Sequence, residues 1–397
     1  EMNTRLQVEH PVTEMVTGLD LVELMIRIAY GEKIPFAQKD VQLNGWAMES
    51  RVYAEDPYRN FLPSTGRLVR YVPPLEGKHV RVDTGVYEGG EISVYYDPMI
   101  AKLVTYGKTR KDAIDHMREA LDAYYIRGVS HNIPFLASLM GKKKFEDGKL
   151  STNFIAEEYP DGFSAKDLPA EDPTLLTGIA ALVHHAYQER AATISGQVAG
   201  HGRELPDTWM VVTGEGKKQT AHQAWVSPHP ERAKGELSDP NLGPASGLVK
   251  VGKHTMTVAS AWTYGSPLLT AEISIDKGES TEVTVQIDPH GAGYRLFHAG
   301  AQIIVKVLTL REAELNRLMP FKPPPDLSKF LLSPMPGLLV SLAVKDGQEV
   351  KAGETLAIVE AMKMENVLKA ERDGTVKKIH QAPGSSLAVD QVILEFG

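Results

Sequence analysis

The chain contains no cysteine among its 397 residues, which excludes disulfide bonds, zinc sites built from thiolates and catalytic cysteines. It also has no basic excess. The 51 acidic side chains outnumber the 43 basic ones and give a net charge of −8, whereas proteins that bind nucleic acid usually carry a basic stripe. We therefore expect no nucleic acid partner.

Long apolar runs are missing as well. The longest are short pieces such as LLV and AIV, far below the roughly 18 residues of a membrane helix. The sequence therefore predicts a soluble protein with no membrane partner. No targeting segment is visible, and the chain begins at Glu1, inside a patterned stretch, so we expect the natural N-terminus to be missing.

The length predicts two to four domains. Residues 1–163 combine helices with strands that lie between about Trp46 and Tyr106, which predicts an α+β domain. A first helix runs from Asp20, a suitable N-cap, to Ala29.

A second helix follows Thr109, which forms a capping box with Asp112, and Gly128 is placed to end it. Its apolar stripe consists of Ile114, Met117, Leu121 and Tyr124.

Residues 164–319 predict a second domain, made of one helix and many short strands. The helix begins at Pro173 with Asp172 as its cap, and the alternating runs after it indicate an antiparallel barrel or sandwich. His184 and His185 are adjacent and about 100° apart on the helix, so we expect surface or hydrogen-bonded histidines and not a metal pair.

Residues 320–330 are a predicted proline-rich linker, whose three consecutive prolines favour an extended, semi-rigid polyproline II segment.

Residues 331–397 contain an internal repeat with an offset of 37 residues. Its matched pairs are Gly337 with Gly374, Gly347 with Gly384, Val350 with Leu387 and Leu356 with Ile393. Neither copy alone could bury its apolar side, so the repeat predicts a quasi-symmetric β-sandwich.

The junction between the two copies is the predicted hairpin IVEAMKMENV, with Lys363 near its tip between Met362 and Met364. A solvated lysine with chance neighbours is one interpretation, and a carrier lysine that projects a cofactor is the other. AMKMEN resembles the attachment motif of biotin carboxyl carrier domains. Lipoyl domains share the symmetric fold but usually show Asp-Lys-Ala, so the resemblance implies biotin covalently attached to Lys363.

The first ten residues, EMNTRLQVEH, alternate polar and mostly apolar side chains. In a strand, the polar residues would form one row about 26 Å long. The ordinary explanation of this alternation is a half-exposed strand whose solvent-exposed face is polar. The alternative is a site: Glu1 and Asn3 offer oxygen ligands for Mg²⁺, and the next polar side chains offer donors for a small oxyanion and a base.

This stretch resembles the metal and bicarbonate strand of biotin carboxylases, which are ATP-grasp enzymes, and ESRVYAEDP and YYDPMIAKL resemble two further segments of that family. The resemblance implies that Glu1 and Asn3 bind Mg²⁺ or Mn²⁺ and that Arg5, Gln7 and the Val8 backbone hold bicarbonate.

The resemblance also implies that Glu9 deprotonates bicarbonate for attack on ATP, which gives carboxyphosphate. Arg51 would stabilise negative charge on the ureido oxygen of biotin, and Phe61 would line the biotin site. The family's ATP-binding part precedes EMNTRLQVEH, so this chain alone is expected to be inactive.

About 167 residues separate the first domain from the carrier, fewer than the roughly 200 of a barrel-type transferase. A carboxyltransferase must then act in trans. The chain thus resembles the alpha subunits of biotin-dependent acyl-CoA carboxylases, and YIRGVSHNIPFL with YPDGF favours the propionyl-CoA type over the 3-methylcrotonyl-CoA type.

The resemblance implies two partners, a carboxyltransferase beta subunit in an α6β6 hetero-oligomer and a biotin protein ligase. It also implies a location in the bacterial cytoplasm or the mitochondrial matrix. Residues 164–319 are the predicted docking domain for the beta subunit. A non-catalytic biotin carrier or scaffold is the alternative from a different functional class.

Overall fold

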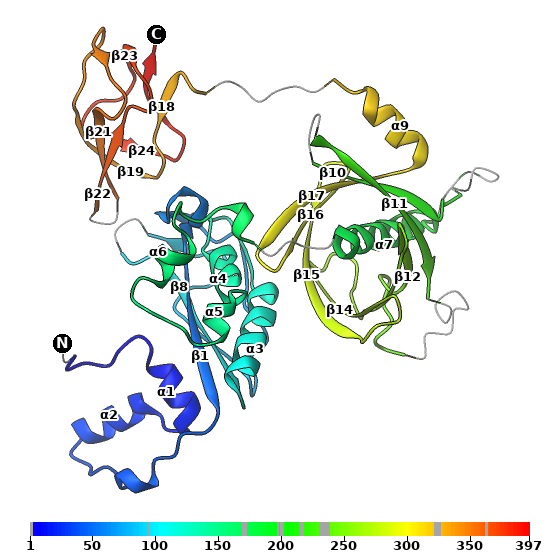
Figure 1. Cartoon of the computed structure of the whole chain (residues 1–397), viewed down its shortest axis with the longest axis horizontal. Helices are drawn as coiled ribbons and strands as arrows, with labels where there is room; N and C mark the ends of the chain where they lie inside the picture. The colour runs from blue at the N-terminus through cyan, green and yellow to red at the C-terminus, as the bar shows by residue number, and fades with distance from the viewer. Residues whose placement is uncertain are drawn as a thin grey trace. The chain divides into compact units, whose positions relative to one another are not determined.

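The computed structural model describes residues 3–93, 96–168, 173–196, 198, 202, 204–214, 218–229, 239–320, 327–361 and 364–397 (Figure 1). They form two compact units. The first comprises residues 1–117, 126–167 and 323–397, and the second comprises residues 118–125 and 168–322. Within the described part of the chain, no helix is long and apolar enough to cross a membrane.

The N-terminal stretch is not a strand, so that prediction is wrong for its described residues. Residues 3–9 are irregular, and helix α1 (His10–Thr17) follows them with a proline in its first turn. A strand needs a neighbour to complete its hydrogen bonds, and no described strand pairs with these residues. Alternation of side chains alone does not supply that neighbour.

Helix α2 (Leu21–Ala29) confirms the first predicted helix and its cap, because Asp20 Oδ1 accepts a hydrogen bond of 2.8 Å from the amide of Glu23. None of its residues is buried. Its apolar side chains include Met25 and Ile28, which are each 48 % exposed.

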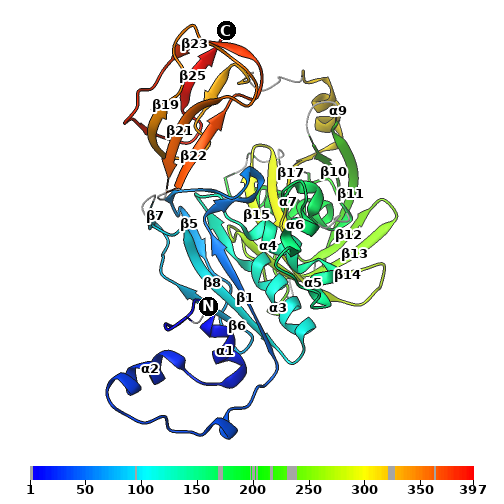
Figure 2. The same ribbon diagram turned by 60° about the vertical axis from the view of Figure 1, so that its left-hand side comes forward.

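An antiparallel sheet in the order β1, β8, β6 forms the centre of residues 1–163 (Figure 2). Its strands are β1 (Trp46–Tyr53), β8 (Met99–Gly107) and β6 (Val80–Thr84). Val52, Leu103 and Val82 lie on one face and are buried. The other face carries charged side chains, and α1 lies against β1 and β8.

Helix α3 (Arg110–Ala123) confirms the predicted capping box, because the amide of Asp112 donates to Thr109 and the Asp112 carboxylate accepts from the amide of Thr109. All four residues of the predicted stripe are buried. Gly128 does not end this helix, contrary to the prediction. The helix stops at Ala123, because the chain then enters strand β9 (Tyr125–Arg127), which pairs with β5.

Short elements complete this region. They are η1 (Gln38–Asp40), β2 (Glu55–Asp56), η2 (Pro57–Arg59), β3 (Leu62–Pro63), β4 (Gly66–Arg67), β5 (Arg70–Val72), β7 (Glu91–Ile92), α4 (Ile133–Met140), α5 (Lys143–Glu146), α6 (Phe154–Glu158) and η3 (Ala165–Asp167). The mixture of helices and antiparallel strands confirms the predicted α+β class.

The second unit is a closed antiparallel barrel, which decides between the predicted barrel and sandwich. Its strands run in sequence order, and β10 pairs with β17 to close the ring. They are β10 (Thr208–Thr213), β11 (Thr220–Pro228), β12 (Gly247–Val251), β13 (His254–Ala259), β14 (Leu268–Ile275), β15 (Thr281–His290), β16 (Gly293–His298) and β17 (Ala301–Leu308). Strand β11 and helix α9 (Leu310–Leu318) were not predicted.

Helix α7 (Pro173–Ala192) lies among the barrel strands (Figure 1). Its apolar residues share one core cluster with side chains from the strands, including Trp209 and Val305. Gly178 permits close contact, since a Cβ there would lie 2.4 Å from Met256 Cε. Asp172, the predicted cap of α7, lies outside the described residues.

Residues 327–397 form two four-stranded sheets, in the orders β18-β25-β23-β20 and β22-β21-β19-β24. The strands are β18 (Phe330–Leu332), β19 (Gly337–Leu342), β20 (Glu349–Val350), β21 (Thr355–Ala361), β22 (Met364–Lys369), β23 (Gly374–Ile379), β24 (Ser386–Leu387) and β25 (Val392–Phe396). Strands β19, β20 and β21 begin 37 residues before β23, β24 and β25. The predicted repeat therefore corresponds to an exchange of equivalent strands between the two sheets.

Candidate active site

Glu9 and Arg51 meet, although 42 residues separate them in the sequence. Arg51 Nη2 donates to Glu9 Oε2 over 3.1 Å. Glu9 stands directly before α1, at its N-cap, and Arg51 projects from the charged face of β1. Their side chains are 53 % and 39 % exposed, so both remain accessible to a small substrate. The structure thus brings together the predicted base and the predicted charge-stabilising residue.

Glu49 joins this pair and was not predicted as a site residue. Its Oε1 lies 3.4 Å from Arg51 Nε, and its side chain is only 7 % exposed. Burial raises the pKa of this carboxyl, and the hydrogen bond and charge of Arg51 oppose that rise. Its Oε2 is buried with no hydrogen-bond partner among the described residues. The sequence signal was the i, i+2 spacing in ESR, which puts both side chains on one strand face.

Asn132 fixes the backbone that carries Arg51, and sequence reasoning missed it too. Its Nδ2 donates to the carbonyl of Arg51 over 3.0 Å, and its Oδ1 accepts from the amide of Tyr53 over 2.9 Å. Its own amide donates to the carbonyl of Tyr53 over 3.1 Å. Asn132 is 6 % exposed and occupies the open edge of β1 as a short piece of strand would.

The predicted bicarbonate residues lie in the irregular stretch before α1. Arg5 and Gln7 are exposed, and Arg5 Nη1 donates to the carbonyl of the neighbouring Leu6 over 3.4 Å. The carbonyl of Gln7 accepts from the amide of His10 over 3.2 Å. Val8 is half-buried. Among the described residues, no hydrogen bond or ion pair joins Arg5 or Gln7 to Glu9 or Arg51.

The predicted metal ligands do not form a site in the part of the chain that is described. Glu1 lies outside it, and Asn3 is exposed. No group of three or more His, Asp or Glu side chains suited to a metal ion occurs within the described ranges. Glu1 and Asn3 as ligands of Mg²⁺ or Mn²⁺ therefore remain a prediction, and we derive no chemical step through a metal.

Phe61 packs within its own domain. Its ring meets Phe135 edge-on, with centroids 4.9 Å apart. Asn60 and Phe61 have φ angles of 53° and 59°, a left-handed conformation that costs about 1 kcal/mol or more for each ordinary residue. The Phe61 side chain is half-buried beside Phe135. A role for Phe61 in binding biotin remains a prediction.

The predicted attachment lysine, Lys363, falls in the sequence between strands β21 and β22. Ala361 pairs with Met364, so residues 362 and 363 form the connection between the two strands. Lys363 and Met362 lie outside the described residues, as does the side chain of Met364. The described strands β21 and β22 pair with each other and fit the predicted hairpin.

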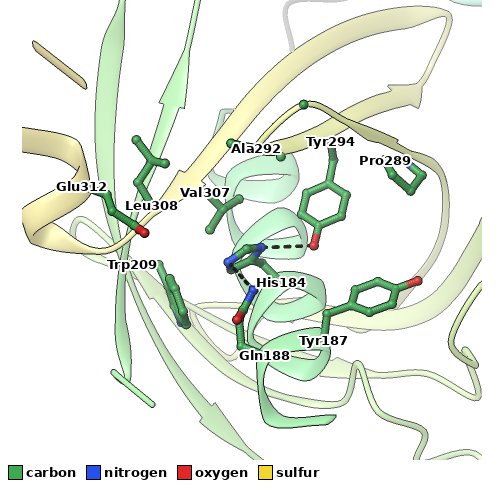
Figure 3. Close-up of a pocket in the computed structure, with 12 residues that line it drawn as sticks. His184, Tyr187, Gln188, Trp209, Pro289, Ala292, Tyr294, Val307, Leu308 and Glu312 are labelled. Atoms are coloured by element: carbon green, nitrogen blue, oxygen red, sulfur yellow. Dashed lines mark hydrogen bonds between the residues drawn. The ribbon is translucent and has the colours of Figure 1, made fainter. Parts of the chain in front are cut away.

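The barrel has a pocket of about 430 Å³ beside α7, lined in part by Trp209, Tyr294 and Glu312. Figure 3 shows His184 between two partners: its Nδ1 lies 3.2 Å from the Tyr294 hydroxyl and its Nε2 lies 3.2 Å from Gln188 Nε2. His185 Nδ1 accepts from the Trp209 indole over 3.3 Å. Both histidines are thus hydrogen-bonded, as predicted.

Four family models match the chain in sequence order. The ATP-binding domain of the carbamoyl-phosphate synthase L chain matches residues 1–37, and the biotin carboxylase C-terminal domain matches residues 49–157. The propionyl-coenzyme A carboxylase BT domain matches residues 176–322, and the family of biotin-requiring enzymes matches residues 329–396.

Curated relatives match over the whole chain. It is 48 % identical to the propionyl-CoA carboxylase alpha chain of Ruegeria pomeroyi, covering 100 % of this chain and 58 % of that protein. It is 42 % identical to the mitochondrial propionyl-CoA carboxylase alpha chain of Homo sapiens, covering 100 % and 52 %. The mitochondrial methylcrotonoyl-CoA carboxylase subunit alpha of Oryza sativa subsp. japonica is 34 % identical, with coverages of 99 % and 55 %. The chain therefore spans about half the length of these relatives.

A solved biotin carboxylase subunit of pyruvate carboxylase is also similar. It is 49 % identical, with a TM-score of 0.39, and the match covers 41 % of this chain and 35 % of that one.

Proposed function

We propose that this chain, which belongs to the biotin-dependent carboxylase family, serves to carboxylate biotin held on Lys363. The carboxyl group is then transferred to an acyl-CoA. Propionyl-CoA, which would give methylmalonyl-CoA, is the proposed acceptor. The contact between Glu9 and Arg51 carries the proposal, because it joins a base and a cation in one accessible site. The higher identity to propionyl-CoA carboxylase alpha chains favours that acceptor over 3-methylcrotonyl-CoA.

Glu9 is the proposed base that removes the proton from bicarbonate. Glu9 stands at the N-cap of α1, and the guanidinium of Arg51 donates to its carboxylate and orients it. Arg5, Gln7 and the backbone of Val8 are the proposed donors to bicarbonate. They must close around the anion, because Arg5 and Gln7 are exposed in this structure.

Arg51 is proposed to stabilise negative charge on the ureido oxygen of biotin. Glu49 holds its Nε side and Asn132 fixes its backbone, so the Nη2 side faces Glu9 and the reacting groups. Donors that are already oriented stabilise developing charge without reorganisation during the reaction. Biotin on Lys363, when bound, supplies a nitrogen that accepts the carboxyl group. Glu1 and Asn3 are the proposed metal ligands and Phe61 the proposed biotin neighbour.

The barrel of residues 164–319 is proposed to dock a carboxyltransferase beta subunit. Its match to the propionyl-coenzyme A carboxylase BT domain supports this role, and so does the lack of room for a transferase between the first domain and the carrier. An α6β6 assembly, modification of Lys363 by a biotin protein ligase, and a bacterial cytoplasmic or mitochondrial matrix location complete the proposal. Residues 320–330 are the proposed linker, and residues 1–163 and 331–397 are the proposed carboxylase and carrier domains.

A chimera tests the proposed function. This chain replaces the matching segment of the Ruegeria pomeroyi alpha chain, and that subunit is combined with its beta subunit. We expect carboxylation of propionyl-CoA that depends on ATP and bicarbonate and is lost in Glu9→Gln and Arg51→Met. A chimera that is biotinylated and assembled but inactive would instead support the non-catalytic carrier.

A further inference from the structure

The charged face of the three-stranded sheet holds side chains that the proposed reaction does not use. We define the charged face as Glu49, Arg51, Arg81, Asp83 and Lys102. Arg51 on β1 is opposite Lys102 on β8, which is opposite Asp83 on β6. Glu49 and Arg81 lie two residues from Arg51 and Asp83, so they share this face. The active-site residues therefore form one end of a charged row that crosses the whole sheet.

Ion pairs link the far end of this row to helix α1. Arg81 Nη1 donates to Glu14 Oε2 over 2.7 Å. Its Nε and Nη2 donate to the two oxygens of Asp83 over 2.7 Å and 2.9 Å, and Lys102 Nζ lies 3.0 Å from Asp83. The Glu14 side chain is 8 % exposed and that of Lys102 is 13 % exposed. Arg81 and Asp83 are 32 % and 26 % exposed, so the pairs are partly shielded from water and restrain geometry more than fully exposed pairs do.

Glu14 also fixes the end of α1. Its Oε1 accepts a hydrogen bond of 2.9 Å from the amide of Leu21, beyond the turn that follows the helix. One buried carboxylate thus joins α1, the start of α2 and strand β6. Removing it would leave Arg81 still paired with Asp83, so the sheet would keep its internal ion pairs while α1 lost its attachment.

Helix α1 is therefore held to the charged face at two points. Glu9, at its N-terminus, contacts Arg51 on β1, and Glu14, five positions later, contacts Arg81 on β6. At a rise of 1.5 Å per residue these points lie roughly 7.5 Å apart along the helix axis. A short helix moves nearly as a rigid body, so a shift at Glu14 is transmitted to Glu9.

We propose that Glu14 and Arg81, supported by Asp83 and Lys102, form a positioning network that sets the Glu9 carboxylate against Arg51. The inference rests on the proposed function, since it assigns the network to the same site. None of the four residues is required to touch substrate. The network explains why a buried, fully paired carboxylate lies in the helix that directly follows the base.

Glu14→Gln is the sharpest test, because it keeps the size of the side chain and removes its charge. The matched control is Glu158→Gln, whose carboxylate is 17 % exposed and pairs with Lys144 over 2.8 Å, in another part of the same unit. Amide hydrogen exchange in this chain reports the positions of α1 and β1 separately. In Glu14→Gln we expect exchange in α1 to become about tenfold faster while β1 is unchanged.

Turnover by the chimera gives the second readout. Glu14→Gln should lower kcat by about 10- to 100-fold and raise the KM for bicarbonate, because a misplacement of about 1 Å can lower the rate about 100-fold. The KM for ATP should stay the same, which a general loss of folding would not produce. Glu158→Gln should match the parent chimera in every measurement.

Each outcome decides a different claim. Unchanged exchange in α1, or faster exchange in both α1 and β1, would overturn the positioning network. Faster exchange in α1 together with an unchanged kcat and an unchanged KM for bicarbonate would also overturn the positioning network. An inactive parent chimera would refute the proposed function, while hydrogen exchange in Glu14→Gln would still decide whether the network holds α1.

Discussion

Asn132→Ala is predicted to loosen strand β1 and to lower activity through Arg51. The substitution removes two side-chain hydrogen bonds, of 3.0 Å to the carbonyl of Arg51 and 2.9 Å from the amide of Tyr53. Both backbone groups lie on the open edge of β1 beside a residue that is only 6 % exposed. The strand would then have to satisfy them with water or leave them unpaired.

The magnitude follows from these two bonds. Each typical hydrogen bond contributes about 1 kcal/mol, and each buried group left unpaired costs about 1 to 3 kcal/mol. Two bonds to one strand edge therefore give a loss of about 2 to 4 kcal/mol in the free energy of local opening. Because 1.4 kcal/mol corresponds to a factor of ten, amides of β1 should exchange about 100-fold faster.

Hydrogen exchange is the appropriate assay, because a chain of several domains has no single free energy of unfolding. Asn153→Ala is the matched control. Asn132 and Asn153 both precede a helix as N-caps without a side-chain capping bond, and Asn153 is exposed. We expect the control to leave β1 unchanged and Asn132→Ala to reduce kcat of the chimera. Protection of β1 within about threefold of the parent would refute the reasoning, since it would put the contribution below 1 kcal/mol.

Three further predictions concern other parts of the chain. Gly293→Ala should destabilise the barrel strongly, because its Cβ would lie 1.9 Å from the carbonyl oxygen of Val305. In Gly291→Ala the Cβ meets nothing within 4 Å, so this variant carries only the strain of its φ of 56°, about 1 kcal/mol. Limited proteolysis should therefore cleave Gly293→Ala much faster than Gly291→Ala. Lys363→Arg should abolish the avidin signal after expression with a biotin ligase, and a surviving signal would exclude Lys363 as the attachment point. Burial lowers the pKa of His131 from 6.5 to about 4. Between these two pH values His131 binds a proton in the unfolded chain but not in the folded chain, so the free energy of unfolding falls as the pH drops from 6.5 to about 4. The loss should be about 2 kcal/mol between pH 7 and pH 5, and His131→Gln should lessen it, as measured by regional hydrogen exchange at both pH values.

The carrier sheets and the long helices could be predicted because their signals are local. The repeat of 37 residues identified equivalent strands, and the stripe that contains Ile114 and Met117 identified α3. Helix α9 was missed although Thr309 and Glu312 form a capping box before it. Four of the nine residues in its short sequence LREAELNRL are charged, and the sequence carries little apolar periodicity, which is the main sequence signal of a helix.

The errors arose where a local pattern depends on a distant partner. Residues 3–9 alternate as a strand does, but alternation does not reveal whether another strand is available to pair with it. Gly128 has the positive φ of 109° that suits a helix end, yet the helix stops five residues earlier because β9 pairs with β5. A local signal for a turn was correct, and its assignment to the helix end was wrong.

Part of the active site was also beyond sequence reasoning. Glu9 and Arg51 were predicted through motifs, and the structure places them in contact. Asn132 acts on Arg51 from 81 residues away, and its sequence context in SHNIP suggests only a helix start. Glu49 became recognisable only when its burial and its distance to Arg51 were known.

Transfer of label from bicarbonate to biotin on Lys363 in the chimera, without any acyl-CoA, tests most directly whether Glu9 and Arg51 act together. We predict label on the Lys363 peptide that requires ATP, and its loss when Arg51→Met separates Glu9 from its partner. The control Glu158→Gln should retain the label. Label that persists in Arg51→Met at the parental rate would contradict the claim that the contact between Glu9 and Arg51 is the centre of the reaction.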